Sequence, residues 1–305
     1  MSASQVEVTL GPLLFNWPAD RTADFYARIA GETAVDRVYL GEVVCGKREP
    51  LLAKVLVAAA ETLKRAGKTV VWSTLALPTT PRDRRTVKSV ATGPGLVEIN
   101  DMSGLIHRPP GAPFVAGPLL NIYNEDAARE LVERGCVRLC ANAELPLSAL
   151  EVICRANPGL EIELFAFGRL QLALSGRCYH ARAEGLHKDT CVFVCDRDRD
   201  GMAVGTLDGE PFLAINGVQT LSHGVQLSDA SLDDLRSAGV TALRLSPHST
   251  DMVRVIAAFR QFADHRITPG ELAEIVQDLG LPGPLVSGYL HGQPGVLKSQ
   301  FAASA

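Results

Sequence analysis

Residues 37–73 read RVYLGEVVCGKREPLLAKVLVAAAETLKRAGKTVVWS, and their pattern determines the fold class that we expect. Two short runs rich in β-branched and aromatic residues, RVYL at 37–40 and TVVWS at 69–73, are typical of buried strands. Between them, residues 51–66 repeat apolar side chains at the helical period, and Gly67 follows as a C-cap. A strand, a helix and a second strand in this order predict a βαβ unit.

The same alternation recurs at intervals of about thirty residues along most of the chain. Seven or eight such units fit a (β/α) barrel better than an open sheet, and no GxGxxG follows a first strand. We therefore expect an α/β fold, a TIM-barrel-like single domain over residues 1–266. A Cys-rich insertion at 176–210 should follow a late strand, and residues 267–305 should form a covering segment. Further strands are predicted at 6–10, 96–99, 114–116, 137–139, 162–167, 211–215 and 242–245, and further helices at 19–30, 82–91, 125–134, 147–155 and 251–262.

The composition is that of a globular protein with ample core. Of 305 residues, 47% are hydrophobic and 21% are charged, and the net charge of −4 is spread along the chain. Nucleic acid is therefore an unlikely main partner, although a local basic patch is not excluded. No apolar run reaches the eighteen or so residues of a membrane span, and the N-terminus lacks the apolar region of a signal peptide. We expect a cytoplasmic protein, in which structural disulfides are rare.

Three of the seven cysteines lie in the predicted insertion. Cys178, Cys191 and Cys195 fall in GRCYHARAEGLHKDTCVFVCDRDRDG at 176–201, which has no apolar period of its own. Such a segment cannot bury enough apolar surface to order itself. Three thiols within eighteen residues indicate a metal centre, since charged neighbours such as Arg177 make three buried core cysteines the weaker interpretation.

The spacing leaves two kinds of metal centre open. Zinc ribbons usually separate paired cysteines by two residues, whereas Cys191 and Cys195 enclose three. His180 and His187 could still complete a zinc site with them. An iron–sulfur cluster tolerates irregular spacing but needs a fourth thiolate from elsewhere. Radical adenosylmethionine chemistry is excluded. Enzymes of that class have a third Cys, with two residues between it and the CxxxC pair, whereas Asp196, Arg197 and Asp198 follow Cys195 in this chain.

Cys45 is the candidate for the fourth thiolate, because it comes just after a predicted strand. Functional residues of a (β/α) barrel gather at the carboxyl ends of its strands. The insertion follows the strand at 162–167 and opens on the same rim, so that four thiols can converge. Cys140 also sits near a strand end and is the rival for this place. Cys136 and Cys154 are better explained as residues of a strand wall and of a helix core.

Other polar residues are weaker candidates for a site. Asn121, Tyr123 and Glu144 each follow a predicted strand and should lie on the rim. HExxH, GxSxG and P-loop motifs are absent from the sequence, so peptidase chemistry has no motif support and the catalytic residues stay unassigned. The histidines that could exchange protons by their pKa range alone are His107, His180, His223 and His248.

Six motifs between about residues 11 and 262 carry a resemblance to a known family: GPLLFNWP, VYLGEVVCGKR, STLALP, PFVAGPLLNIYN, FGRLQLALSGRCYHAR and LSPHSTD. Together they look like the collagenase-like peptidase family, and in particular its members that act in oxygen-independent ubiquinone biosynthesis. The resemblance implies a barrel and a [4Fe-4S] cluster bound by Cys45, Cys178, Cys191 and Cys195. The chain departs from the pattern most at 196–205, DRDRDGMAVG, which is unusually charged.

The resemblance also implies a reaction and a partner. The reaction is hydroxylation of the ring of a prenylated quinone precursor without dioxygen, and the partner is a UbiU-like member of the same family in a heterodimer. A cluster with four thiolate ligands favours electron transfer or a structural role. Two other classes stay open: a zinc-stabilised barrel that acts as an interaction or peptidase-like protein, and RNA base hydroxylation, which related members are implied to perform. The lack of a basic stripe weighs against RNA.

Overall fold

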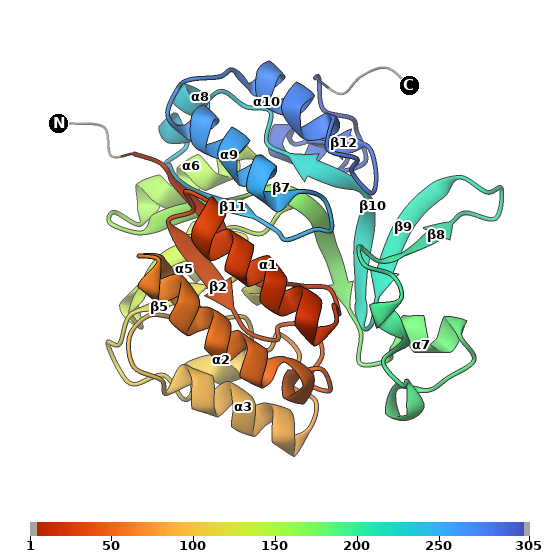
Figure 1. Cartoon of the computed structure of the whole chain (residues 1–305). Helices are drawn as coiled ribbons and strands as arrows, with labels where there is room; N and C mark the ends of the chain where they lie inside the picture. The colour runs from red at the N-terminus through yellow and green to blue at the C-terminus, as the bar shows by residue number, and fades with distance from the viewer. Residues whose placement is uncertain (1–4, 302–305) are drawn as a thin grey trace.

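Within residues 5–301, the part of the chain that this computed structural model describes, eight parallel strands close into a barrel (Figure 1). The first strand pairs with the second and with the last, and the last also pairs with the seventh, which completes the ring. The predicted TIM-barrel-like fold is confirmed. In barrel order the strands are β1 (Glu7–Leu10), β2 (Arg37–Leu40), β3 (Thr69–Ser73), β4 (Val97–Ile99), β5 (Phe114–Ala116), β6 (Cys136–Cys140), β7 (Glu161–Leu174) and β11 (Val240–Leu245).

Helices connect consecutive barrel strands and lie outside the ring (Figure 1). Where the sequence predicted helices, the observed bounds differ from the predicted ones by two residues at most. The short helices α4 and α8 were not predicted. The helices are α1 (Ala19–Glu32), α2 (Glu49–Arg65), α3 (Pro81–Ala91), α4 (Met102–Leu105), α5 (Glu125–Glu133), α6 (Leu147–Ala156), α8 (Leu232–Ser237) and α9 (Met252–Ala263).

Side chains alternate between the two faces of the barrel wall, as the period of two in a strand requires. Val38 and Leu40 belong to the large apolar core that the strands share with the surrounding helices. Tyr39 lies between them in sequence but packs instead with Val71 and Val115 in a separate buried cluster. The wall thus buries apolar side chains on both faces.

β7 is longer than the predicted strand at 162–167 and carries the chain out of the barrel. Up to Phe167 it pairs in parallel with β6 and β11, and from Phe167 onward it pairs antiparallel with β10 (Gln219–Leu227). Gly168 stands at this change of partner with φ +128°, and a Cβ there would come within 2.6 Å of Ser246 Cβ. A glycine is required because both the backbone angle and the close approach exclude a side chain.

The insertion adds a ribbon of antiparallel strands to β7. β10 pairs with β9 (Pro211–Asn216), which pairs with β8 (Met202–Gly205), and the ribbon projects to one side of the barrel (Figure 1). The sequence analysis did not predict β8 or β10. The pairing of β10 with β7 contains register shifts around Leu221, and bulges of this kind interrupt the alternation of apolar residues. Between β7 and β8 lie α7 (Tyr179–Ala183) and the short 3₁₀ turns η2 (Lys188–Thr190) and η3 (Val194–Asp196).

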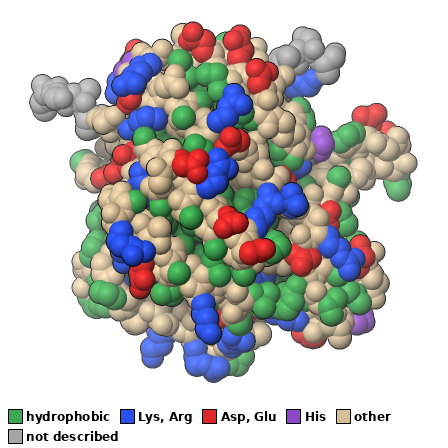
Figure 2. All heavy atoms as spheres, in the orientation of Figure 1, with side chains coloured by type: hydrophobic (Ala, Val, Ile, Leu, Met, Phe, Trp, Pro, Cys, Tyr) green, Lys and Arg blue, Asp and Glu red, His purple; other side chains and the backbone are tan. Residues whose placement is uncertain are grey.

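The C-terminal residues pack back onto the rest of the fold. They contain α10 (Pro269–Gln277), β12 (Leu285–Val286) and the 3₁₀ turn η4 (Gly288–His291), and β12 pairs in parallel with β10. Within residues 5–301 no helix combines the length and the apolar character that crossing a bilayer requires. On the face drawn in Figure 2, side chains of both charges are interspersed.

Candidate metal centre

The four cysteines that the resemblance implies as ligands lie at the carboxyl end of the barrel; we call Cys45, Cys178, Cys191 and Cys195 the thiol site. Cys45 follows β2, and the other three lie between β7 and β8. Cys178 and Cys191 belong to one buried apolar cluster, and Cys45 packs against it. The sulfurs of Cys191 and Cys195 act electrostatically on Cys178. The remaining buried members of the cluster are Leu14, Val43, Val44, Ala76, Ala181 and Val218.

The loop after β2 fixes Cys45 through the side chain of Glu42. One carboxylate oxygen of Glu42 accepts hydrogen bonds from the backbone N–H groups of Val44, at 2.9 Å, and of Cys45, at 2.8 Å. Burial raises the pKa of the Glu42 carboxyl, and the charge of Arg48 opposes that effect. Glu42 therefore holds the backbone of Cys45 in place, as a polar group behind a metal ligand often does.

The two cysteines of the CxxxC segment are turned inward by an unusual backbone. Val192 and Phe193 have φ angles of +39° and +56°, in the left-handed region that side chains with a Cβ rarely adopt. Val192 is 73% exposed, whereas Cys191 and Cys195 are buried. Strained conformations of this kind persist only where surrounding contacts impose them, and they cluster at functional sites. On the other side of the thiol site, Cys178 caps α7, and its sulfur accepts from Ala181 N at 3.4 Å.

Arg48 brings a buried positive charge into the thiol site. Its side chain is 1% exposed, and Nη2 donates to Cys195 Sγ at 3.4 Å and to Asn216 Oδ1 at 2.7 Å. Nη1 donates to Leu14 O at 3.1 Å, and the backbone N–H of Arg48 donates to Cys45 O at 2.8 Å. Arg48 thus links the loops that carry Cys45 and Cys195. Both Glu42 and Arg48 are buried although they are charged.

The four thiols of the thiol site are donors of a kind that several metal centres use. Four thiols are the ligands of zinc and of iron–sulfur clusters. Among the described residues, however, no three His, Cys, Asp or Glu side chains lie close enough together to hold one metal ion. Burial raises the pKa of the Cys45 and Cys178 thiols, while Arg48 lowers both, so a bound metal and this cation would favour the thiolate together.

The histidines considered for zinc are not placed to act as ligands. His180 is buried, but its Nε2 lies 3.1 Å from Asp198 Oδ2 and its Nδ1 lies 3.3 Å from Ile215 O. Both ring nitrogens therefore have partners in the protein. His187 is exposed on the turn before η2.

The three remaining cysteines lie in the barrel wall or on a helix. Cys140 is fully buried beside the charged groups of Arg244 and Glu163, and burial raises the pKa of its thiol well above the usual value. Burial also raises the pKa of Cys136 to about 11. Cys154 is half-buried on α6. Cys45, and not Cys140, shares the apolar cluster with Cys178 and Cys191.

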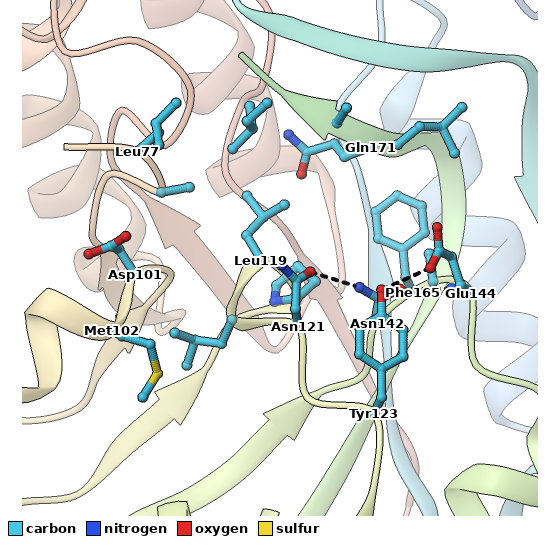
Figure 3. A pocket seen from close by; sticks show the side chains of 17 residues that line it. Leu77, Asp101, Met102, Leu119, Asn121, Tyr123, Asn142, Glu144, Phe165 and Gln171 are labelled. Atoms are coloured by element: carbon cyan, nitrogen blue, oxygen red, sulfur yellow. Dashed lines mark hydrogen bonds between the residues drawn. The ribbon is translucent and has the colours of Figure 1, made fainter. Parts of the chain in front are cut away.

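A cavity of about 400 Å³ adjoins the thiol site at the same end of the barrel; we call it the rim pocket (Figure 3). Ala76, Leu119 and Leu174 line this pocket and also belong to, or pack against, the apolar cluster around the cysteines. The apolar cluster around the cysteines therefore borders the rim pocket. The side chains labelled in Figure 3 are Leu77, Asp101, Met102, Leu119, Asn121, Tyr123, Asn142, Glu144, Phe165 and Gln171.

The polar wall of the rim pocket contains the three rim residues that the sequence singled out. Tyr123 Oη donates to Glu144 at 2.8 Å, and Asn142 Nδ2 donates to Asn121 Oδ1 at 3.2 Å (Figure 3). Burial and this hydrogen bond to Glu144 raise the pKa of Tyr123 to about 12, so its proton is retained at neutral pH. Asn121 has φ +57°, which asparagine tolerates better than most residues.

A buried network of charges inside the barrel was not found by sequence reasoning. Arg244 on β11 pairs with Glu98 on β4 and, at 2.8 Å, with Glu163 on β7. Glu163 also accepts hydrogen bonds from Tyr39 Oη, at 2.8 Å, and from the Thr9 hydroxyl. Burial alone would raise the pKa of the Glu163 carboxyl, but the guanidinium groups of Arg244 and Arg138 outweigh it and hold the pKa below its usual value.

The sequence did carry a signal for this network, since each of the three charged residues stands alone in an apolar strand: VEI, IELF and ALRL. Glu98 and Arg244 line a narrow cavity of about 20 Å³, which shares Phe165 and Leu119 with the rim pocket. The charges therefore lie beneath the floor of the rim pocket.

Of the other histidines, His248 is buried between aromatic rings. Its Nε2 accepts from Arg169 N at 3.2 Å, its Nδ1 lies 3.0 Å from Ser246 O, and its ring packs edge-on against Phe15 and Phe167. These contacts are those of a structural residue. His107 and His223 are half-buried and do not line the rim pocket.

Two solved structures are similar to the chain at low identity. One is a thiamine phosphate pyrophosphorylase from Pyrococcus furiosus, with 12% identity, a TM-score of 0.39, and coverage of 90% of this chain and 97% of that chain. Another is a truncated 3-deoxy-D-arabino-heptulosonate 7-phosphate synthase from Thermotoga maritima, with 12% identity, a TM-score of 0.41, and coverage of 90% and 84%. At these values neither similarity says anything about activity. The sequence itself matches the family described as peptidase family U32 over residues 26–299, and the chain belongs to this family.

Proposed function

We propose that the chain is the iron–sulfur subunit of a complex that hydroxylates the ring of a prenylated quinone precursor without dioxygen, as a UbiV-like protein in ubiquinone biosynthesis. In this proposal Cys45, Cys178, Cys191 and Cys195 bind one [4Fe-4S] cluster. A UbiU-like member of the same family is the partner in a heterodimer. The bound cluster would supply or accept single electrons beside the substrate.

The observation that carries the proposal is that the rim pocket and the apolar cluster around the cysteines share residues at the carboxyl end of the barrel. Four thiols from two distant segments lie at the end of the barrel where (β/α)-barrel enzymes hold their substrates. Ala76, Leu119 and Leu174 border both the apolar cluster around the cysteines and a cavity large enough for an aromatic ring. A redox centre and a binding cavity in this arrangement support electron transfer to or from a bound molecule.

The lining of the rim pocket suits an uncharged phenolic ring. None of the residues that line it is Lys, Arg or His, and two are acidic, Asp101 and Glu144. Asn121 and Asn142 offer amide groups that can bind ring hydroxyls, while Phe165 offers an aromatic face. Tyr123 holds its proton against Glu144 and can donate only after that hydrogen bond rearranges.

The same lining argues against the alternatives. An RNA substrate would bring phosphates to a pocket that holds two carboxylates and no cation, which is unfavourable. His180, which could have completed a zinc site, is engaged by Asp198 and Ile215. Peptidase chemistry is not supported by any pairing of a nucleophile with a base in the rim pocket.

Iron and sulfide analysis of anaerobically purified protein tests the cluster. We expect about four irons and four sulfides per cluster-binding chain, and loss of the visible absorption when any one of the four thiol-site cysteines is replaced by Ala. Cys140→Ala and Cys154→Ala are matched controls and should keep the colour. Zinc without sulfide would contradict the proposal, and a colourless Cys140→Ala beside a coloured Cys45→Ala would show that the fourth ligand is misassigned.

A deletion strain tests the pathway. Without oxygen, a strain that lacks the gene should make no ubiquinone and should accumulate a precursor short of one ring hydroxyl, whereas in air it should make ubiquinone normally. Equal loss with and without oxygen would defeat the assignment. Full hydroxylase activity of the single purified chain would defeat the proposed heterodimer.

A further inference from the structure

Arg48 is a buried cation that lacks a carboxylate partner. Within the described residues its side chain donates to a cysteine sulfur, an amide oxygen and a backbone carbonyl oxygen. Among the described residues Glu42 acts on it electrostatically, without a hydrogen bond or ion pair to it. Burial of a charge without a counter-charge is costly, so the site should contain negative charge when the protein is complete. The sulfurs of Cys195 and Cys45 and the carboxyl of Glu42 can carry it, and all three act electrostatically on Arg48, but only Cys195 accepts a hydrogen bond from its side chain.

We propose that Arg48 is a positioning residue for the metal centre, whose fixed positive charge makes the bound cluster easier to reduce. This inference rests on the proposed function, since it requires the cluster. Adding one electron to a centre with four thiolate ligands increases its negative charge, and a guanidinium 3.4 Å from one ligand sulfur stabilises that added charge. Hydrogen bonds to the ligand sulfurs and the net charge around a cluster are known determinants of its potential.

The surrounding chain is built to hold the guanidinium in this position. Asn216 on β9 accepts from Nη2, and its own Nδ2 donates to the backbone carbonyls of Cys195 and Asp198, both at 2.9 Å. Gly217 follows with φ +68°, and a Cβ at this position would come within 2.4 Å of Nη2. The space for the guanidinium therefore exists only because residue 217 has no side chain.

The forked guanidinium is essential to the arrangement. Arg48 contacts Leu14 O through Nη1 and contacts Cys195 Sγ and Asn216 Oδ1 through Nη2, so that one planar group joins three segments. A lysine ammonium keeps the charge but is a point donor on a flexible stem, and it cannot reproduce the fixed fork. Replacing Arg48 by Lys therefore tests the geometry of the side chain, and replacing it by Gln tests its charge.

The experiment compares the midpoint potential of the cluster in four proteins by anaerobic titration with dithionite, followed by electron paramagnetic resonance. They are wild type, Arg48→Gln, Arg48→Lys and the control Arg65→Gln, which removes a positive charge from the exposed end of the same helix α2. Iron and sulfide content is measured in each. We expect a more negative potential in Arg48→Gln, an intermediate one in Arg48→Lys, and no shift in Arg65→Gln.

Two further outcomes are informative. Loss of iron from Arg48→Gln with retention in Arg48→Lys also supports the inference, because the charge is then needed to hold the anionic centre. An unchanged potential in an iron-loaded Arg48→Gln overturns it, and so does equal loss of iron from both Arg48 variants, which would indicate a role in packing alone. Absence of iron and sulfide from wild type would instead refute the proposed function, and the inference with it.

Discussion

Replacing Glu163 by Gln should strongly destabilise the barrel, because Glu163 is the anion at the centre of the buried network. The substitution keeps the shape of the side chain but removes the charge that Arg244 contacts at 2.8 Å and that Tyr39 and Thr9 contact through their hydroxyl groups. Breaking a buried ion pair from one side costs about 3–5 kcal/mol. We expect about 3 kcal/mol, the lower end of that range, because Glu98 still pairs with Arg244 and the amide oxygen can still accept one hydrogen bond.

The matched control is Glu161→Gln on the same strand. Glu161 pairs with Arg138 at 2.7 Å, but its side chain is 49% exposed, and partly solvated pairs contribute at most about 1 kcal/mol. Urea unfolding followed by circular dichroism should show a midpoint lowered by about 1 M in Glu163→Gln, if the slope is about 3 kcal/mol/M. Equal midpoints in Glu163→Gln and wild type would refute the argument.

The pH dependence gives a second check on the same variant. The pKa of Glu163 is lowered in the folded protein, so its contribution is fully present above the unfolded-state pKa of about 4.3 and is lost as the pH falls through the folded-state value. The difference between wild type and Glu163→Gln should therefore be constant near neutral pH and shrink below about pH 4. A difference that does not change with acidification would show that packing, and not charge, is responsible.

Three further predictions follow from the rim and the insertion. Limited proteolysis should cleave metal-free protein between Arg177 and Arg199 and spare the loaded protein, and equal resistance would mean that protein contacts alone hold the segment. Val192→Gly should raise the melting temperature of the metal-free protein. Relief of the left-handed backbone stabilises the folded state by about 1–2 kcal/mol, whereas the greater freedom of glycine in the unfolded chain costs about 0.5–1 kcal/mol. A lowered melting temperature would show that the backbone at Val192 is not strained. Glu144→Gln should lower the pKa of Tyr123 from about 12, measured as the alkaline absorbance that Tyr123→Phe removes, and an unchanged value would mean that burial alone sets it.

The sequence predicted the barrel because its strands and helices have clear periods, as RVYL and TVVWS show. It failed beyond Phe167, because the second half of β7 and β10 are held by bulged antiparallel pairing that leaves no simple alternation. At the candidate site, types of residue and their place on the rim could be predicted, and Asn121, Tyr123 and Glu144 do line one pocket. The burial of Arg48 could not be predicted from the sequence, because it depends on Asn216 and Gly217, which are far from Arg48 along the chain.

The order in which the barrel strands are synthesised bears on when a cofactor can enter. Glu7 on β1 lies opposite Ala242 on β11, so the ring cannot close until the ribosome has released the residues that follow the insertion. Cys45, Cys178, Cys191 and Cys195 all emerge before that point. A nascent chain therefore presents all four thiols on an open barrel that lacks only its last strand, so that under the proposed function a metal centre could be inserted during translation, before that strand closes the wall.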